Sequence, residues 1–157
     1  MGWVNVHLRT RVAALSGFLG SYLHQIDGKG RLSLPAAFRR DASDGPLVLV
    51  QVHENALTLY PESAWAEVEE RLRDLLRRQP QARSYVLGVT ANAVEVVPDK
   101  QGRILVPQRL LTAVGLAETA MVVGVIDRIE VWNPDRFTET VEAGAAEGAD
   151  FAGQVFG

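Results

Sequence analysis

An aspartate followed four residues later by an arginine occurs twice in this chain, at Asp27 to Arg31 and at Asp99 to Arg103. A guanidinium group suits phosphate oxygens and can donate two parallel hydrogen bonds to guanine. A carboxylate at this spacing can accept hydrogen bonds from the amides of a turn and can pair with the arginine. The pattern predicts a turn in which the aspartate holds the loop and directs the arginine toward a polyanion.

The same two stretches contain Gly30 and Gly102, and a lysine near each tip, Lys29 and Lys100. Glycine lets a backbone approach a polyanion closely, and each lysine adds a second cation. The structural alternative is an ion pair that merely closes the turn, worth about 0–1 kcal/mol at a surface. Both interpretations stay open on composition, and the repeated use of one acid–base spacing favours binding.

The overall charge argues against a general nucleic-acid binder, because the 157 residues include 16 basic and 19 acidic ones, for a net charge of −3. Charge is distributed unevenly, however. Residues 27–40 contain four basic side chains and one acidic one, and residues 99–109 contain three and one. The acidic residues concentrate around residues 67–74 and toward the C-terminus. We therefore expect a basic loop face on an acidic body.

Enzyme chemistry has little support in the sequence. The absence of cysteine excludes a disulfide framework and a thiolate nucleophile, and it fits a reducing cytosol. His7, His24 and His53 are scattered, and His24 is expected to be a half-buried structural residue. The glycines beside Lys29 lack P-loop spacing, and Gln101 replaces that lysine in the second stretch. The sequence predicts no catalysis, cofactor, metal or small-molecule substrate, and no apolar run reaches the roughly 20 residues of a membrane span.

An ungapped offset of 72 residues aligns the two halves of the chain, including the apolar strands and aromatic residues downstream of the turns. The identities near the turns pair Asp27, Gly30, Arg31 and Pro35 with Asp99, Gly102, Arg103 and Pro107. A unit of this size is small for its own core, so we expect the two copies to bury each other's apolar strands. The expected organisation is a loose leader (1–16), two domains (17–80 and 81–143) and a flexible, frayed tail (144–157).

Within each copy the pattern predicts two strands around the charged turn, a short helix, a hairpin and a final helix. The expected strands cover 22–26, 31–34, 47–52 and 56–60, then 94–97, 103–106, 121–125 and 128–132. The short helices begin at Pro35 and Pro107, and Gly115 is expected to end the second in left-handed conformation. The final helix of the first copy has an apolar stripe from Trp65 to Leu76. The final helix of the second copy is capped by Asn133. Another short helix is expected after Pro80, between the two copies. The hairpin turns are expected to use left-handed backbone at Asn55 and Asp127.

Four strings, "GSYLHQIDGKGRLSLPAAFR", "LTLYPESAW", "DKQGRILVPQRL" and "GVIDRIEVW", resemble the MraZ family of bacterial transcriptional regulators. The similarity runs from about Phe18 to Val141. It implies an α+β, mostly β fold, in which two tandem swapped-hairpin, AbrB-like β-barrel half-domains with short helices pack together. It also implies a ring-shaped homo-oligomer in the cytoplasm and nucleoid.

By the same resemblance, the protein binds direct repeats in double-stranded promoter DNA and represses the cell-division and cell-wall gene cluster. The residues that would contact DNA are Arg31 and Arg103, and the carboxylates that would hold them are those of Asp27 and Asp99. The same two loops contain Lys29 and Lys100. Two alternatives remain: a ring that binds an acidic protein partner, and an antitoxin-like regulator whose tail binds a partner.

Overall fold

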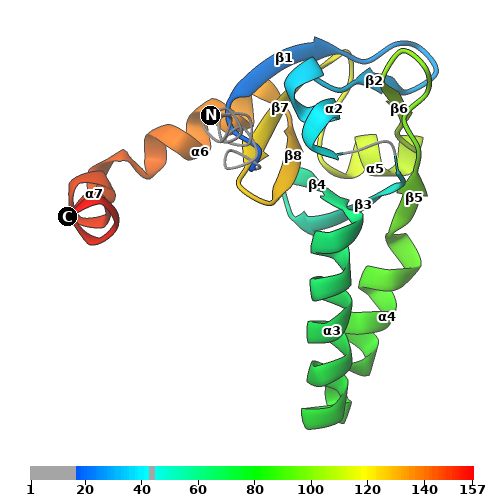
Figure 1. Ribbon diagram of the computed structural model, residues 1–157, viewed down its shortest axis with the longest axis vertical. Helices are drawn as coiled ribbons and strands as arrows, with labels where there is room; N and C mark the ends of the chain where they lie inside the picture. The colour runs from blue at the N-terminus through cyan, green and yellow to red at the C-terminus, as the bar shows by residue number, and fades with distance from the viewer. Residues whose placement is uncertain (1–16, 43–44) are drawn as a thin grey trace, which may run out of the picture.

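The computed structural model describes residues 17–42 and 45–157, so the expected leader lies outside the described residues. Within them, six antiparallel strands form one sheet in the order β1-β7-β8-β4-β3-β5, and β2 pairs with β6 in a separate ribbon (Figure 1). The strands are β1 (Ser21–Gln25), β2 (Arg31–Ser33), β3 (Leu47–His53), β4 (Ala56–Pro61), β5 (Val94–Val96), β6 (Arg103–Leu105), β7 (Thr119–Val125) and β8 (Arg128–Trp132). The fold is therefore a mostly-sheet α+β fold, as expected.

The helices occupy the positions between and after these strands. They are α2 (Ala36–Ala42), α3 (Glu62–Arg78), α4 (Arg83–Asn92), α5 (Gln108–Ala113), α6 (Pro134–Ala143) and α7 (Gly148–Phe156), with short 3-10 turns at Pro80–Ala82 and Ala145–Glu147. Helices α3 and α4 project from the sheet as a stem, on the side away from β2 and β6 (Figure 1). Among the described residues, no helix is both long and apolar enough to cross a membrane.

The two sequence repeats exchange strands. Strand β1 of the first copy pairs with β7 of the second, and β5 of the second copy pairs with β3 of the first. The hairpins β3–β4 and β7–β8 meet in the middle of the sheet through β4 and β8. Each copy thus completes the sheet of the other, which is the mutual burial that the small size of the repeat requires. The swapped-hairpin barrel itself stays a prediction.

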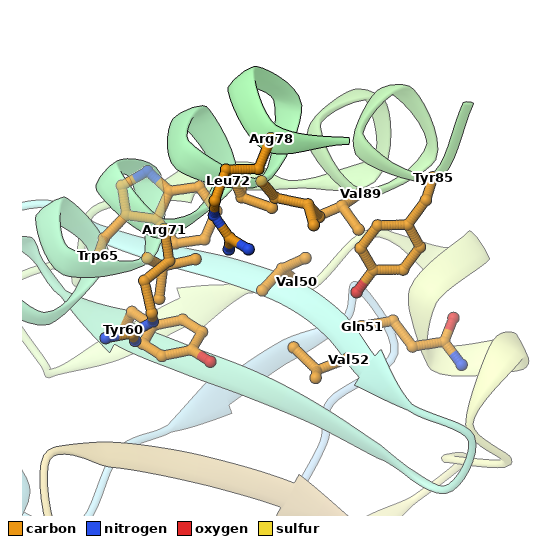
Figure 2. A pocket seen from close by; sticks show the side chains of 12 residues that line it. Val50, Gln51, Val52, Tyr60, Trp65, Arg71, Leu72, Arg78, Tyr85 and Val89 are labelled. Carbon is orange, nitrogen blue, oxygen red and sulfur yellow. The ribbon is translucent and has the colours of Figure 1, made fainter. Parts of the chain in front are cut away.

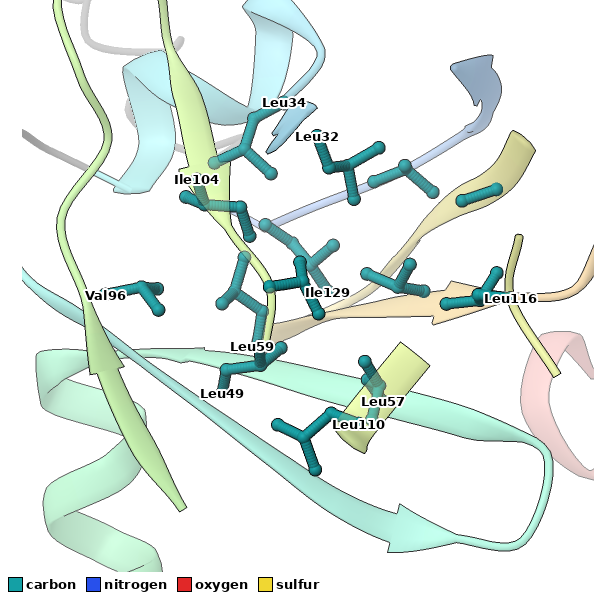
Figure 3. Close-up of a cluster of buried hydrophobic side chains, with 14 of the residues drawn as sticks. Leu32, Leu34, Leu49, Leu57, Leu59, Val96, Ile104, Leu110, Leu116 and Ile129 are labelled. Atoms are coloured by element: carbon teal, nitrogen blue, oxygen red, sulfur yellow. The ribbon is translucent and has the colours of Figure 1, made fainter. Parts of the chain in front are cut away.

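One apolar core connects the ribbon to the sheet. Leu32 of β2 and Ile104 of β6 are fully buried, and they meet Leu49, Leu59 and Ile129 from the sheet (Figure 3). Burying one such side chain contributes about 1.5–3 kcal/mol. The short three-residue strands are therefore held in place by the core as well as by their hydrogen bonds.

The termini of several elements match the sequence closely. Helices α2 and α5 begin directly after Pro35 and Pro107, and Gly115 follows α5 with φ +72°. Asn133 caps α6, because its Oδ1 accepts hydrogen bonds from two backbone amides at 2.9 and 3.2 Å. The prolines and the glycine supply the fixed and left-handed φ values that these positions need.

Two expectations differ from the structure. The left-handed residue of the β7–β8 turn is Ile126 (φ 65°), and it is the only non-glycine residue with positive φ in the described part of the chain, so Asn55 and Asp127 do not have this conformation. Ile126 is held there by two backbone hydrogen bonds to Phe18, at 2.7 and 3.0 Å. The expected frayed tail also differs, because it forms helix α7, whose side chains are all exposed.

Candidate functional site

The first charged turn (residues 27–31, called loop 1) is organised by one carboxylate. Asp27 Oδ1 accepts hydrogen bonds from the amides of Lys29 and Arg31, each at 2.9 Å. Asp27 Oδ2 accepts from Arg31 Nε at 2.7 Å. The turn is closed by the Gly30 amide, which donates to the carbonyl of Asp27 at 3.0 Å. One side chain therefore fixes both the backbone of the loop and the direction of its arginine.

The second turn (residues 99–103, called loop 2) repeats this arrangement. Asp99 Oδ1 accepts from the amides of Gln101 and Arg103 at 2.9 Å, and Oδ2 accepts from Arg103 Nε at 2.9 Å. The Gly102 amide donates to the carbonyl of Asp99 at 2.9 Å. The same contacts form although both residues between the acid and the glycine differ, Gly28-Lys29 in loop 1 and Lys100-Gln101 in loop 2, so the Asp-x-x-x-Arg spacing itself determines the loop.

The hydrogen bonds keep both carboxylates charged. The Arg31 amide and then its guanidinium lower the pKa of Asp27 to about 2, and the Arg103 amide is the main cause that lowers the pKa of Asp99. Each pairing uses the Nε edge of the guanidinium. No described residue accepts a hydrogen bond from the terminal nitrogens of Arg31 or Arg103, whose side chains are 36% and 30% exposed. The outer edge of each guanidinium can therefore bind a ligand.

The ribbon brings the two arginines together. In the antiparallel register Arg31 lies opposite Leu105, Leu32 opposite Ile104, and Ser33 opposite Arg103. Residues that face each other across two strands point to the same side, and residues two apart on one strand do so as well. Because Leu32 and Ile104 point into the core, Arg31 and Arg103 share the outer face, on diagonal positions with a typical separation of about 7–8 Å.

Each loop is also tied to the opposite repeat. The Leu34 amide donates to the carbonyl of Gly102, and the Val106 amide donates to the carbonyl of Gly30, both at 2.9 Å. Gly30 and Gly102 have φ values of +87° and +76°, which side-chain-bearing residues rarely adopt. A Cβ on Gly30 would lie 2.7 Å from the carbonyl oxygen of Val106. Both glycines are thus needed for the positive φ, and Gly30 is also needed for the close approach of the Val106 carbonyl in loop 1.

Arg39 is one of the four basic residues within residues 27–40, and the sequence pattern predicts no specific role for it. Arg39 of α2 donates through Nη1 to the carbonyl of Gln101 at 3.0 Å, and its side chain lies over Gly102. The 72-residue offset places Leu111 at the equivalent position, and that leucine packs beside Gly30. Loop 2 therefore has an additional guanidinium beside it, and comparing the two repeats position by position could have revealed the difference.

The remaining candidate residues lie where the sequence suggested. Lys29 and Lys100 are exposed on their loops, and neither makes an ion pair with another residue of the described ranges. His24 is half-buried on β1. Residues 17–42 and 45–157 contain no group of three or more histidine, cysteine, aspartate or glutamate side chains arranged to hold a metal. The arrangement offers guanidinium groups held in fixed positions on a ribbon, with terminal nitrogens that can donate hydrogen bonds to an anion.

The chain is similar to a set of named proteins. The model of a family described as "MraZ protein, putative antitoxin-like" matches residues 18–86 and again residues 89–150. A protein of Thermomicrobium roseum named "Transcriptional regulator MraZ" is 42% identical over 135 residues, covering 86% of this chain and 94% of its own. Proteins with the same name from Pediococcus pentosaceus and Desulfitobacterium hafniense are 39% identical over 125 residues and 42% over 136. They cover 80% and 83% of this chain, and 87% and 94% of their own lengths.

Proposed function

The chain belongs to the MraZ family, and from this premise we propose that it is a transcriptional regulator that binds operator DNA through loops 1 and 2. The observation that carries the proposal is the shared outer face of the β2–β6 ribbon. There Arg31 and Arg103 lie diagonally, each held by an aspartate through Nε, while the terminal nitrogens are left for a ligand. A two-stranded ribbon is one of the elements that the major groove of B-DNA can admit.

Preorganisation explains why an acidic residue belongs in an anion-binding loop. Arginine loses side-chain freedom when it binds, and a side chain already held in position loses less. The carboxylates of Asp27 and Asp99 provide this hold at 2.7 and 2.9 Å. In this proposal the two arginines contact phosphates or guanine edges, and Lys29 and Lys100 contact the phosphate backbone.

The proposal includes assembly, because one chain presents few cations. Non-specific binding by such contacts has a Kd of typically 10⁻⁴–10⁻⁶ M, and linked sites can add a factor of about 10²–10⁴. Copies related head-to-tail close into a ring and match direct repeats in DNA. That the regulated genes are the cell-division and cell-wall cluster, that the effect is repression, and that the protein resides at the nucleoid rest on the family resemblance alone.

The decisive experiment is footprinting and gel shift of the purified chain on DNA from upstream of its own gene, with shuffled DNA of equal length as competitor. We expect protected direct repeats on the upstream DNA, and loss of the shift in a double Arg31→Ala, Arg103→Ala variant. Arg73→Ala is the matched control, because Arg73 is an exposed arginine of the stem that pairs with Glu70. Equal binding to both DNAs, or an unaffected double variant, would exclude these loops as the operator-binding site and leave an acidic protein as the candidate partner.

A further inference from the structure

One large apolar side chain lies on the outer face of the β2–β6 ribbon, beside the arginines of the two loops. Leu105 of β6 is 58% exposed. It lies opposite Arg31 across the ribbon, and it follows Arg103 by two positions on its own strand. Residues in these relative positions point to the same side of a ribbon. The outer face therefore presents an exposed apolar group next to two guanidinium groups.

The hydrogen bonds of the ribbon bring Leu105 close to loop 1. The Val106 amide donates to the Gly30 carbonyl at 2.9 Å, so these two residues form a hydrogen-bonded pair. The next pair, Arg31 and Leu105, is then a non-hydrogen-bonded pair, whose side chains are the closest in an antiparallel ladder, with Cβ atoms about 4.5–5.5 Å apart. A Cβ on Gly30 would lie 3.9 Å from Leu105 Cδ1. The leucine thus leans toward loop 1.

The other end of the ribbon is polar. The 72-residue offset places Ser33 at the position equivalent to Leu105, and Ser33 lies opposite Arg103. Loop 2 also has the guanidinium of Arg39 beside it. A serine hydroxyl can donate or accept a hydrogen bond, so it suits several bases. The ribbon therefore has one apolar end, at loop 1, and one polar end, at loop 2.

The stem has a larger apolar surface of a different character. The groove between α3, α4 and β3 has a volume of about 360 Å³ and is lined mainly by aromatic and aliphatic side chains (Figure 2). The arginines that line it, Arg71 and Arg78, pair with Glu67 and Asp74 of the same helix. The guanidinium groups beside Leu105 instead have terminal nitrogens available for a ligand. A polyanion that displays an apolar group therefore suits the ribbon better than the groove.

We propose that Leu105 contacts the 5-methyl group of a thymine in the operator, next to the position contacted by Arg31. The proposal rests on the operator binding proposed above, and it adds a residue that distinguishes one base from another. The thymine methyl is the apolar group that a base displays in the major groove. Neighbouring bases on one strand are about 3.4 Å apart along the helix axis. The separation of Arg31 and Leu105 therefore allows contact with neighbouring base pairs.

This contact gives the recognised site a direction. Each chain has the leucine at one end of its ribbon and Ser33 at the other, so the two ends of the ribbon prefer different bases. A palindrome presents the same bases in both directions, whereas a direct repeat does not. An asymmetric ribbon is therefore matched to the direct repeats of the proposed function.

The test removes the methyl group from the DNA and the leucine from the protein in a double-mutant cycle. Each thymine of one protected repeat in the upstream DNA is replaced in turn by deoxyuracil, which lacks only the 5-methyl group. Fluorescence anisotropy gives the Kd of each DNA for the wild type and for Leu105→Ala. We expect one position at which deoxyuracil weakens wild-type binding roughly fourfold, as for the burial of one methyl group. In Leu105→Ala the same replacement should have no effect.

Two further variants separate this contact from a general effect. Leu105→Met keeps an apolar side chain of similar volume and should retain the sensitivity to deoxyuracil. Leu87→Ala removes a leucine of α4 that is 51% exposed, and it should match the wild type on both DNAs. Thermal melts and circular dichroism verify that each variant is folded. Since both leucines are exposed, neither truncation leaves a cavity in the core.

Two results would overturn the proposal: wild-type binding that is insensitive to deoxyuracil at every thymine, or a loss that is equally large in Leu105→Ala. If the double Arg31→Ala, Arg103→Ala variant still loses binding, either result removes the thymine contact and leaves operator binding by the loops intact. A wild type that binds upstream and shuffled DNA equally would instead overturn both proposals.

Discussion

Arg31 and Arg103 lie diagonally across the β2–β6 ribbon, although 72 positions separate them in the chain. Each is opposite a different residue, Leu105 for Arg31 and Ser33 for Arg103, so the two guanidinium groups occupy neighbouring positions on one face. The buried pair Leu32 and Ile104 fixes which face this is. A single ligand of the size of a duplex can therefore contact both arginines at once.

Removing either guanidinium should weaken operator binding without unfolding the protein. We expect Arg31→Ala and Arg103→Ala each to reduce affinity roughly tenfold to hundredfold, corresponding to about 1–3 kcal/mol per contact. The thermal midpoint should stay close to that of wild type, since these ion pairs are at the surface. Fluorescence anisotropy and thermal melts measure the two quantities, and a large drop in the melt would identify the arginine as structural. In the double variant, neighbouring contacts should not add independently.

Salt should weaken operator binding in proportion to the phosphates contacted. The slope of log K against log salt is about −0.9 for each phosphate neutralised on B-DNA. If Lys29, Lys100 and both arginines contact phosphates, one chain contributes a slope of roughly −3 to −4. Lys29→Ala should reduce the steepness by about one, whereas Arg31→Ala leaves the slope unchanged if that arginine reads guanine. A flat plot for the wild type would contradict phosphate contact.

Acid should remove the stability contributed by the loop carboxylates. The folded pKa of Asp27, about 2, lies below its ordinary value of 3.8, so the unfolded chain takes up the proton first as pH falls. This contribution is complete above about pH 4 and is lost between about pH 4 and pH 2. Urea unfolding between pH 7 and pH 2 follows the change, and Asp27→Asn should reduce its pH dependence.

The cause of the lowered pKa can be tested separately by NMR titration of the Asp27 carboxyl. The main contribution comes from the backbone amide of residue 31, which alanine also provides. In Arg31→Ala the pKa of Asp27 should therefore rise but remain below 3.8. A return to the ordinary value would show that the guanidinium alone holds the loop, and a loss of DNA binding in that variant would then also reflect a disordered loop.

Alanine at the two loop glycines should destabilise the protein unequally. Both positions have positive φ, which costs a non-glycine residue about 1–2 kcal/mol. At Gly30 the new Cβ would also collide with the backbone carbonyl of Val106, whereas at Gly102 it would meet the movable side chain of Arg39. We expect Gly30→Ala to lower the free energy of unfolding more than Gly102→Ala does. Equal losses in urea titrations would indicate that the loops relax in the same way.

Local features of the fold could be predicted because they depend on neighbours in the sequence. The Asp-x-x-x-Arg turns, the helices after Pro35 and Pro107 and the cap at Asn133 all follow from groups within four residues of each other. The left-handed residue of the β7–β8 turn was predicted wrongly because it depends on a distant contact. The backbone of Ile126 is held by Phe18, more than one hundred positions away in the sequence.

Periodicity and short-range hydrogen bonding are enough to predict the duplication, the strands and the loops in which each aspartate binds its arginine. The pairing of β2 with β6, the common face of the two arginines and the position of Arg39 over loop 2 are visible only in the folded chain. They depend on burial, because a three-residue strand has many possible partners, and the pairing that places Leu32 and Ile104 in a common core is selected by the whole molecule.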